Sequence, residues 1–291
     1  MIDLDVHAHL APIKESVLGK LARVAWDAEK EILTLDGHQV GMKNLFHADR
    51  LIARMDHHDV KRALVSIPPP LYRQDLTSQD ALVWARYVNE GMLEITRASR
   101  GRLGALLYVP LEHPSLLREL LKDFEDVLFE GVALAAGGHP AIIYSSEQYA
   151  ELWSWLDQRS MFVFLHPGNC CDTRLTNYYL HNLVGNPIET GVAAAHLVMA
   201  GVPERYSRIR FCLAHAGGIF TSLIGRMERG FDTTRPGVDM TIERPFAAAK
   251  RLFVDNIAHD DGVLDLCEKI YGKDHILYGS DWPFPMGLRE D

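Results

Sequence analysis

The sequence predicts a (β/α)₈ barrel. Eight short runs rich in Val, Ile, Leu, Phe and Ala alternate with segments of helical period, and most runs are nearly continuous in apolar residues. Strands of a parallel sheet that is buried on both faces have this character. Eight βα units close a barrel, for which a chain of 291 residues is long enough. A doubly wound open sheet is the alternative, but no G-x-G-x-x-G follows any run, so its dinucleotide-binding form lacks support.

The bounds of the individual strands and helices follow from these apolar runs and helical periods. Capping residues precede several helices, at 77–78, 145–146 and 260–261. The predicted strands are Ile2–Val6, Ala63–Ile67, Leu103–Val109, Gly131–Ala135, Phe162–Leu165, Arg210–Ala214, Leu252–Ile257 and His275–Tyr278. The predicted helices are Leu51–His58, Ser78–Ala98, Glu112–Leu128, Ser146–Gln158, Pro187–Ala200, Phe220–Phe231 and Gly262–Tyr271.

We expect residues 1–291 to form this one barrel. Residues 11–47 are too many for an ordinary βα loop, so we expect a small insertion over the barrel mouth. The sequence stops at Asp291, shortly after the eighth predicted strand, and the outer helix expected there is absent from it.

Charge and composition exclude several classes of partner. The formal net charge is −9, from 30 Lys and Arg against 39 Asp and Glu, which argues against a nucleic-acid or anionic-membrane binder. No apolar run has the length of a membrane span, and MIDLDVHAHLAP lacks the features of a signal peptide. The four cysteines form no CxxC pattern. These features predict a cytoplasmic protein with reduced thiols, and they still allow a small carboxylate substrate, which one arginine can bind.

Potential metal ligands fall at the ends of predicted strands. His7 and His9 end the first, and residues i and i+2 of an extended chain point to the same side. His166 ends the fifth strand, His215 the sixth and Asp281 the eighth. Active sites of (β/α)₈ barrels lie at the carboxyl ends of the strands, so we expect these side chains to converge. Imidazole and carboxylate suit zinc or a similar divalent ion, with one position open for water.

With these motifs, the sequence resembles the amidohydrolase superfamily, in particular the branch of aminocarboxymuconate-semialdehyde decarboxylase and related non-oxidative decarboxylases. The resemblance covers nearly the whole chain. It is carried by IDLDVHAHLAP, RMDHHDVKRALVSIP, LGALLYVP, FVFLHP, LVGNPIET, CLAHAGGIFTSLIGRMERGF and GKDHILYGSDWPFPMG, of which HxH and GSDWPFP are the most specific.

The resemblance implies a role for each matching residue. The ligands of Zn²⁺, with Mn²⁺ or another divalent ion as alternatives, would be His7, His9, His166 and Asp281. His215 would be the general acid and base. Arg226 would reach the substrate carboxylate of the neighbouring subunit, assisted by Arg235, which makes the expected protein a homodimer.

Three departures from the family pattern concern the number of metals and the substrate pocket. The fourth strand offers no lysine for a carbamate-bridged pair of metals. Gln39 and Lys43 stand where the decarboxylase supplies a second carboxylate-binding arginine, and Asn182 replaces its tryptophan before LVG.

We therefore expect a metal-dependent decarboxylase of an unsaturated or aromatic carboxylic acid. Metal, water and base would equally serve a hydrolase or hydratase acting on a lactone or another ring-cleavage product, which is the alternative enzyme class. A catalytically silent binding or scaffold barrel is the remaining alternative, although such a protein usually loses a ligand or the base.

Overall fold

The computed structural model describes residues 1–288 and contains one eight-stranded, all-parallel sheet. Its strands pair in chain order, which is the order of a (β/α)₈ barrel and confirms the predicted fold class. They are β1 (Ile2–His9), β5 (Val60–Ser66), β6 (Leu103–Tyr108), β7 (Gly131–Ala135), β8 (Phe162–His166), β9 (Arg210–Leu213), β10 (Phe253–Asp255) and β11 (Ile276–Leu277).

The segment after the last strand returns to the first one. The N–H of Val6 donates to the carbonyl of Tyr278 at 2.9 Å, and Ala8 forms a parallel bridge with Trp282. Strand β1 is therefore bonded to β5 on one side and to residues 278–282 on the other. This pairing closes the strand order on itself, as a barrel requires.

Hydrophobic burial explains the strands. Every residue of β6, β7 and β8 is buried, so these runs have no solvent-facing side and their sequences do not alternate. The helices between strands are instead amphipathic, with buried residues at three- and four-residue spacing along α3. The α-helices are α1 (Glu15–Leu18), α2 (Ala48–His57), α3 (Ser78–Ala98), α4 (Leu117–Asp123), α5 (Ala150–Gln158), α6 (Asn186–Met199), α7 (Val202–Arg205), α8 (Phe220–Asp232), α9 (Pro245–Ala249) and α10 (Asp261–Ile270).

The predicted helix caps are present. Thr77 accepts a hydrogen bond from the N–H of Asp80, Ser146 accepts one at the start of the 3₁₀ turn before α5, and Asp260 accepts one from Val263. The helix predicted over 112–128 is shorter than expected. Pro114 begins a 3₁₀ turn, Pro114–Leu116, and α4 covers only Leu117–Asp123. Proline has no N–H to give to a preceding turn, so the α-helix begins after it.

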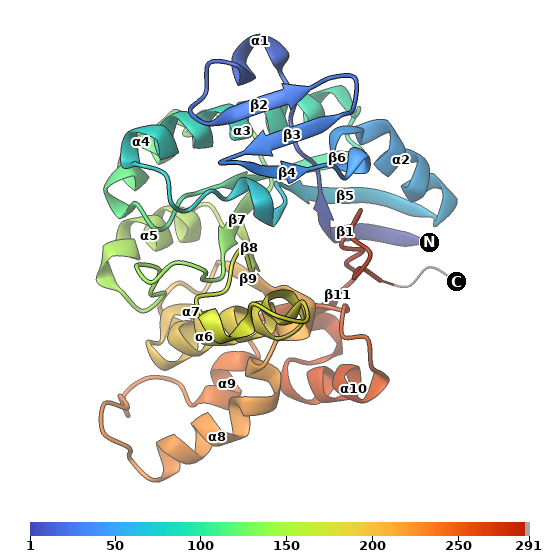
Figure 1. Ribbon diagram of the computed structural model, residues 1–291. Coiled ribbons are helices and arrows are strands. Elements are labelled where there is room, and N and C mark those ends of the chain that lie inside the picture. Colours follow the sequence, from blue (N-terminus) through green and yellow to red (C-terminus); the bar gives the residue numbers. More distant parts are fainter. Residues whose placement is uncertain (289–291) are drawn as a thin grey trace. The chain divides into compact units, whose positions relative to one another are not determined.

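The chain divides into two compact units, Met1–Ala133 with Tyr278–Asp291, and Leu134–Leu277. The first unit contains a separate antiparallel sheet of β2 (Val24–Asp27), β3 (Ile32–Leu35) and β4 (His38–Val40), which Figure 1 draws beside α1. Asp36 and Gly37 join β3 to β4 and both have positive φ, 52° and 87°, the conformation of a two-residue hairpin turn.

This small sheet is fixed to the segment that follows β5. Arg73 donates to both carboxylate oxygens of Asp36 at 2.7 and 2.9 Å and to the carbonyl of Ala22 at 2.7 Å. Residues 11–47 thus form ordered structure; their placement over a barrel mouth stays a prediction.

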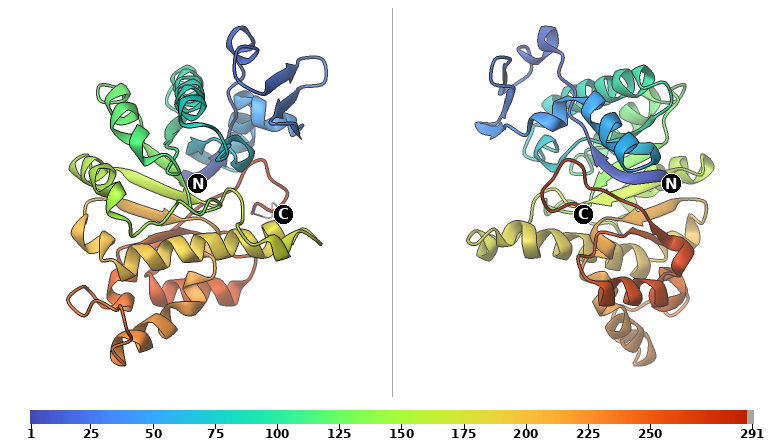
Figure 2. Two further views of the ribbon diagram at one scale, coloured as in Figure 1. Left: turned by 60° about the vertical axis from the view of Figure 1, so that its left-hand side comes forward. Right: turned by 90° about the vertical axis from the view of Figure 1, so that its right-hand side faces the viewer.

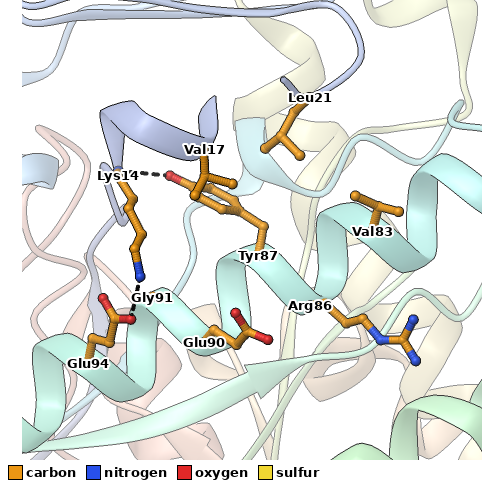
Figure 3. Close-up of a pocket in the computed structure, with 9 residues that line it drawn as sticks. All are labelled: Lys14, Val17, Leu21, Val83, Arg86, Tyr87, Glu90, Gly91 and Glu94. Carbon is orange, nitrogen blue, oxygen red and sulfur yellow. Dashed lines mark hydrogen bonds and ion pairs between the residues drawn. The ribbon is translucent and has the colours of Figure 1, made fainter. Parts of the chain in front are cut away.

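A pocket of about 200 Å³ lies between α1 and α3 in the same unit (Figure 3). Lys14 and Glu94 form an ion pair at its edge, and Tyr87 donates to the carbonyl of Pro12. A Cβ on Gly91 would lie 2.3 Å from Pro12, so glycine permits this close approach to the helix. The pocket is lined by Lys14, Val17, Leu21, Val83, Arg86, Tyr87, Glu90, Gly91 and Glu94, which include none of the predicted site residues.

The second unit carries the helices from α5 to α10, and Figure 2 shows α6 as its longest helix and the loop of residues 233–244 between α8 and α9. The short helices α7 and α9 were not expected from the sequence. Each has proline in its first turn, where the missing N–H costs no hydrogen bond. Within residues 1–288, no helix combines the length and apolar character that a membrane span requires.

Candidate metal centre and active site

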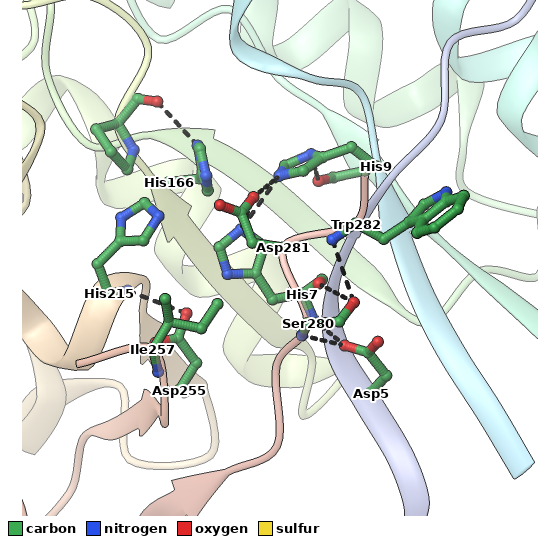
Figure 4. A network of polar contacts seen from close by, with 12 residues as sticks. Asp5, His7, His9, His166, His215, Asp255, Ile257, Ser280, Asp281 and Trp282 are labelled. Carbon is green, nitrogen blue, oxygen red and sulfur yellow. Dashed lines mark hydrogen bonds and ion pairs between the residues drawn. The ribbon is translucent and has the colours of Figure 1, made fainter. Parts of the chain in front are cut away.

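Three predicted ligands meet in the first unit. The Nε2 atoms of His7 and His9 are 3.1 Å apart, and Oδ1 of Asp281 lies 3.1 Å from the first and 3.3 Å from the second. All three residues are buried, with exposed fractions of 0%, 0% and 4%. Figure 4 shows the two imidazole rings and the carboxylate directed at one another.

These separations fit a common metal ion. Nitrogen and oxygen ligands lie about 2.0–2.2 Å from zinc and ions of similar size. Two such ligands at angles between octahedral and tetrahedral values are then about 3.0–3.4 Å apart, by simple trigonometry on those bond lengths. The observed distances of 3.1–3.3 Å fall in this interval. The three residues therefore form a candidate site for a divalent metal.

Backbone pairing places the three donors together. His7 and His9 both lie in β1 two positions apart, so both side chains are on the same side of the strand. The carbonyl of His7 accepts hydrogen bonds from the N–H groups of Ser280 and Asp281 at 3.2 and 2.7 Å. Asp281 has φ of 55°, a left-handed conformation that turns the chain just after this pairing.

A buried carboxylate, Asp5, supports this pairing. Its Oδ1 accepts from the N–H of His7 at 3.0 Å and from the N–H of Ser280 at 3.1 Å, so it joins the two segments that carry the ligands. Nη1 of Arg54 lies 3.6 Å from Oδ2. Burial raises the pKa of Asp5, while the hydrogen bonds from Ser280 and His7 and the charge of Arg54 oppose that rise.

The far side of the His9 ring is also held. Its Nδ1 lies 3.1 Å from Oγ of Ser66 and 3.3 Å from the carbonyl oxygen of Ile67, both at the end of β5. Such contacts fix the tautomer and orientation of metal-binding histidines and leave Nε2 for the metal. Burial lowers the pKa of His9, against the opposing effect of Asp281, and thereby favours the neutral imidazole that binds metals.

His166 and His215 lie in the second unit, at the ends of the adjacent parallel strands β8 and β9. Their ring centroids are 5.2 Å apart with an interplanar angle of 64°. Nδ1 of His166 lies 2.8 Å from the carbonyl oxygen of Pro167, the kind of contact that directs Nε2 to a ligand. His166 is the last residue of β8, and His215 follows β9 by two positions.

A second buried carboxylate holds the backbone of His215. Asp255, at the end of β10, accepts from the N–H groups of His215, Ala216 and Ile257 at 3.0, 2.9 and 3.1 Å (Figure 4). His215 and Ala216 both have positive φ, 55° and 53°, which non-glycine residues rarely adopt. Asp255 therefore stabilises a strained turn that determines where the His215 ring is presented.

The two predicted substrate-binding arginines are exposed. Arg226 lies on α8, and no hydrogen bond or ion pair joins it to another residue in the described part of the chain. Arg235 lies after α8 and donates to the carbonyl of Thr233.

Asp5 and Asp255, the carboxylates that hold the backbone around these side chains, were not predicted from the sequence. Asp255 ends a strand, the same signal that identified the histidines, and Asp5 lies two positions before His7 in β1. Their positions in the strands could have identified both aspartates as candidates. Nothing in the sequence shows that their partners are backbone N–H groups.

The family model described as amidohydrolase matches residues 4–290. The chain belongs to this family.

Several proteins that are similar to this chain are named as decarboxylases. The 2-amino-3-carboxymuconate-6-semialdehyde decarboxylase of Dictyostelium discoideum is 26% identical over 98% of this chain and 83% of its own length. The 6-methylsalicylic acid decarboxylase of Penicillium expansum is 28% identical over 75% of this chain and 68% of its own length. A dihydroxybenzoic acid decarboxylase of a Polaromonas species, solved with manganese and 2-nitroresorcinol, has a TM-score of 0.75 and 20% identity, over 99% of this chain and 88% of that one. This structural likeness supports the barrel fold.

Proposed function

We propose that this amidohydrolase-family protein is a metal-dependent, non-oxidative decarboxylase of an unsaturated or aromatic carboxylic acid. The observation that carries the proposal is the buried cluster of His7, His9 and Asp281, whose spacing fits one divalent ion. The names of the similar proteins give the reaction type and the chemical class of substrate.

We propose Zn²⁺ as the resident ion, with Mn²⁺ as the main alternative, because imidazole and carboxylate ligands accept both. His166 is the proposed fourth ligand, since the carboxyl ends of barrel strands open onto one mouth. When bound, such an ion supplies Lewis-acid stabilisation of negative charge on substrate oxygens.

His215 is the proposed proton donor. Its protonated imidazole gives a proton to the substrate carbon that bears the carboxylate, and a neutral ring remains. The bond from that carbon to the carboxylate then breaks, CO₂ leaves, and the bonding electron pair returns to the conjugated system of the product. His215 regains a proton from water. The net change replaces CO₂ by hydrogen and needs no oxidant or reductant.

Substrate binding and assembly form a finer part of the proposal. Arg226, assisted by Arg235, binds the substrate carboxylate in the neighbouring subunit of a cytoplasmic homodimer, and residues 11–47 cover the mouth. The exposure of Arg226 is compatible with such a contact.

Mixed dimers test this arrangement: Arg226→Ala subunits combined with His215→Ala subunits should regain activity if the arginine acts across the interface. Inactive mixed dimers would contradict it.

Measurement of CO₂ release tests the reaction. Protein freed of metal and reloaded with Zn²⁺ or Mn²⁺ is incubated with 2-amino-3-carboxymuconate semialdehyde, 6-methylsalicylate and dihydroxybenzoates, and CO₂ and the decarboxylated product are quantified together. We expect metal-dependent release in equal amounts, lost in His215→Ala. Protein with stoichiometric metal that releases no CO₂ from the panel would contradict the proposal.

A further inference from the structure

A glutamate near the start of α6 binds two loops that follow strands of the barrel. Glu189 is buried, with 9% of its surface exposed. Its Oε2 accepts from the N–H of Gly138 at 3.0 Å, and its Oε1 accepts from the N–H of Cys171 at 2.9 Å. Gly138 follows β7, and Cys171 follows β8 and its terminal His166. One carboxylate thus joins the exits of two neighbouring strands.

The sequence around this carboxylate leaves little room for another arrangement. A Cβ on Gly137 would lie 2.0 Å from Oε2 of Glu189, so only glycine allows the carboxylate to reach the loop. A Cβ on Gly185, just before α6, would lie 2.6 Å from Cβ of Cys170. Both loops after β7 and β8 therefore pack directly against the start of α6.

The same part of α6 contacts a third loop, the one that begins with His215. The carbonyl of Pro187 accepts from the N–H of Ile219 at 3.1 Å. A Cβ on Gly218 would lie 2.4 Å from that carbonyl oxygen, and a Cβ on Gly191 would lie 2.2 Å from Cγ1 of Ile219. Residues 185–191 consequently contact the exits of β7, β8 and β9.

We propose that Glu189 is a positioning residue, which fixes the loops after β7 and β8 and, through the start of α6, the orientation of His166 and His215. The effect on the loops stands on the contacts above, whereas the effect on turnover rests on the proposed decarboxylase function. Glu189 acts through the backbone of these loops and is not assigned a contact with substrate.

Its negative charge and two oxygens are both required. A carboxylate accepts from two separate N–H groups, and such charge-assisted bonds are stronger than those of a neutral amide. A glutamine side chain of the same shape keeps one acceptor, but its NH₂ group faces the other N–H and cannot accept from it. Glu189→Gln should therefore release one loop or the other without emptying the space.

Hydrogen–deuterium exchange of the metal-loaded protein, read by mass spectrometry, tests the role in the loops. In Glu189→Gln we expect about tenfold faster exchange in whichever of the two loop peptides, 136–142 or 168–174, faces the NH₂ group of the glutamine, because its bond to a charged acceptor is lost. Peptides within β8 and β9 should keep wild-type rates. Glu147→Gln, an exposed glutamate of the same unit, is the matched control and should change neither loop peptide.

A second variant distinguishes a local effect on the loops from a general folding defect. Gly137→Ala keeps the Glu189 charge but places a methyl group where the carboxylate lies, so it should give the same local pattern of faster exchange. Wild-type exchange of both loops in either variant, or equally faster exchange across the whole unit in both, would overturn the proposal.

Steady-state kinetics tests the consequence for turnover. We expect Glu189→Gln to lower kcat about tenfold, with KM and bound metal near wild type, because small displacements of catalytic groups slow chemistry. An unchanged kcat despite mobile loops would overturn the effect on turnover. If the wild type releases no CO₂ while the exchange pattern is as expected, the decarboxylase function fails and the role of Glu189 in the loops stands.

Discussion

Asp5 and Asp255 are both fully buried carboxylates that accept hydrogen bonds from backbone N–H groups. They lie in different units, and their negative charges are stabilised by different partners. Asp5 accepts two N–H groups and lies 3.6 Å from Arg54. Asp255 accepts three N–H groups, two of them from residues of positive φ. Loss of Asp5 leaves a buried cation, whereas loss of Asp255 frees a strained turn. The first change should mainly affect stability and the second mainly catalysis.

Substitution of a proposed metal ligand should give the largest effect on turnover, against which the effects at Asp5 and Asp255 can be compared. Asp281→Ala should lower turnover by about a thousandfold, because a bound ion contributes several kcal/mol to stabilising the transition state. Metal content by atomic emission should fall in parallel. Asp274→Ala, an exposed aspartate, is the control. Full activity of Asp281→Ala with bound metal would refute its role as a ligand.

Asp5→Ala tests the stability side of the comparison. Removal of one partner of a buried ion pair typically costs about 3–5 kcal/mol, because the remaining charge loses its counter-charge. We expect a loss of about 3 kcal/mol in the free energy of unfolding, measured with urea on metal-free protein. The double variant Asp5→Ala with Arg54→Met should recover part of it. If the double variant is as unstable as the single one, Arg54 is not the cause.

Asp255→Asn tests the catalytic side. The asparagine side chain can no longer accept from all three N–H groups, so the turn that presents His215 should shift. Misplacement of a catalytic group by about 1 Å can cost roughly a hundredfold in rate. We expect such a fall in kcat with KM and metal content little changed. A variant that loses stability but retains kcat would reverse the contrast with Asp5.

Glu112 is a buried carboxylate with weaker hydrogen bonding than Asp5 or Asp255. The hydroxyl of Tyr108 lies 3.4 Å from Oε1 of Glu112, but it donates its one proton to the carbonyl of Tyr72 at 2.6 Å. Burial raises the pKa of Glu112 to about 7 from an ordinary value of 4.5. The folded protein thus holds this proton at pH values where the unfolded chain has lost it.

This raised pKa predicts the sign of a pH effect on stability. The contribution of Glu112 to the free energy of unfolding should fall as pH rises from 4.5 through 7, by about 2 kcal/mol between pH 5 and 7. Glu112→Gln, which cannot ionise, should lack this component. Urea unfolding at both pH values, wild type against variant, measures it; identical pH dependence of the two proteins would rule it out.

The sequence predicted the framework of the site better than its supports. His7, His9, His166, His215 and Asp281 could be placed at or just after strand ends, because strand ends follow from the hydrophobic period. Asp5 and Asp255 could not be assigned, because their partners are backbone N–H groups 275 and 40 positions away. Every residue except proline carries that donor, so the sequence has no distinguishing mark of the contact.

Local structure was missed where the relevant signal was short. The β3–β4 hairpin could have been predicted from Asp36-Gly37 between alternating apolar residues. The helix predicted over 112–128 was too long because its apolar spacing was given more weight than Pro114. Whether residues 11–47 cover the mouth depends on packing, which neither turn chemistry nor period encodes.

The pairing of β1 with the segment after β11 has a consequence for the order of events during synthesis. Ser280, whose N–H donates to the carboxylate of Asp5, lies 275 positions after Asp5 in the chain. At about 5–20 residues per second, the ribosome makes His7 and His9 many seconds before it makes Asp281. Until then His7 and His9 lack the carboxylate that lies beside them in the folded protein, so the cluster of three side chains can assemble only after Asp281 has been synthesised.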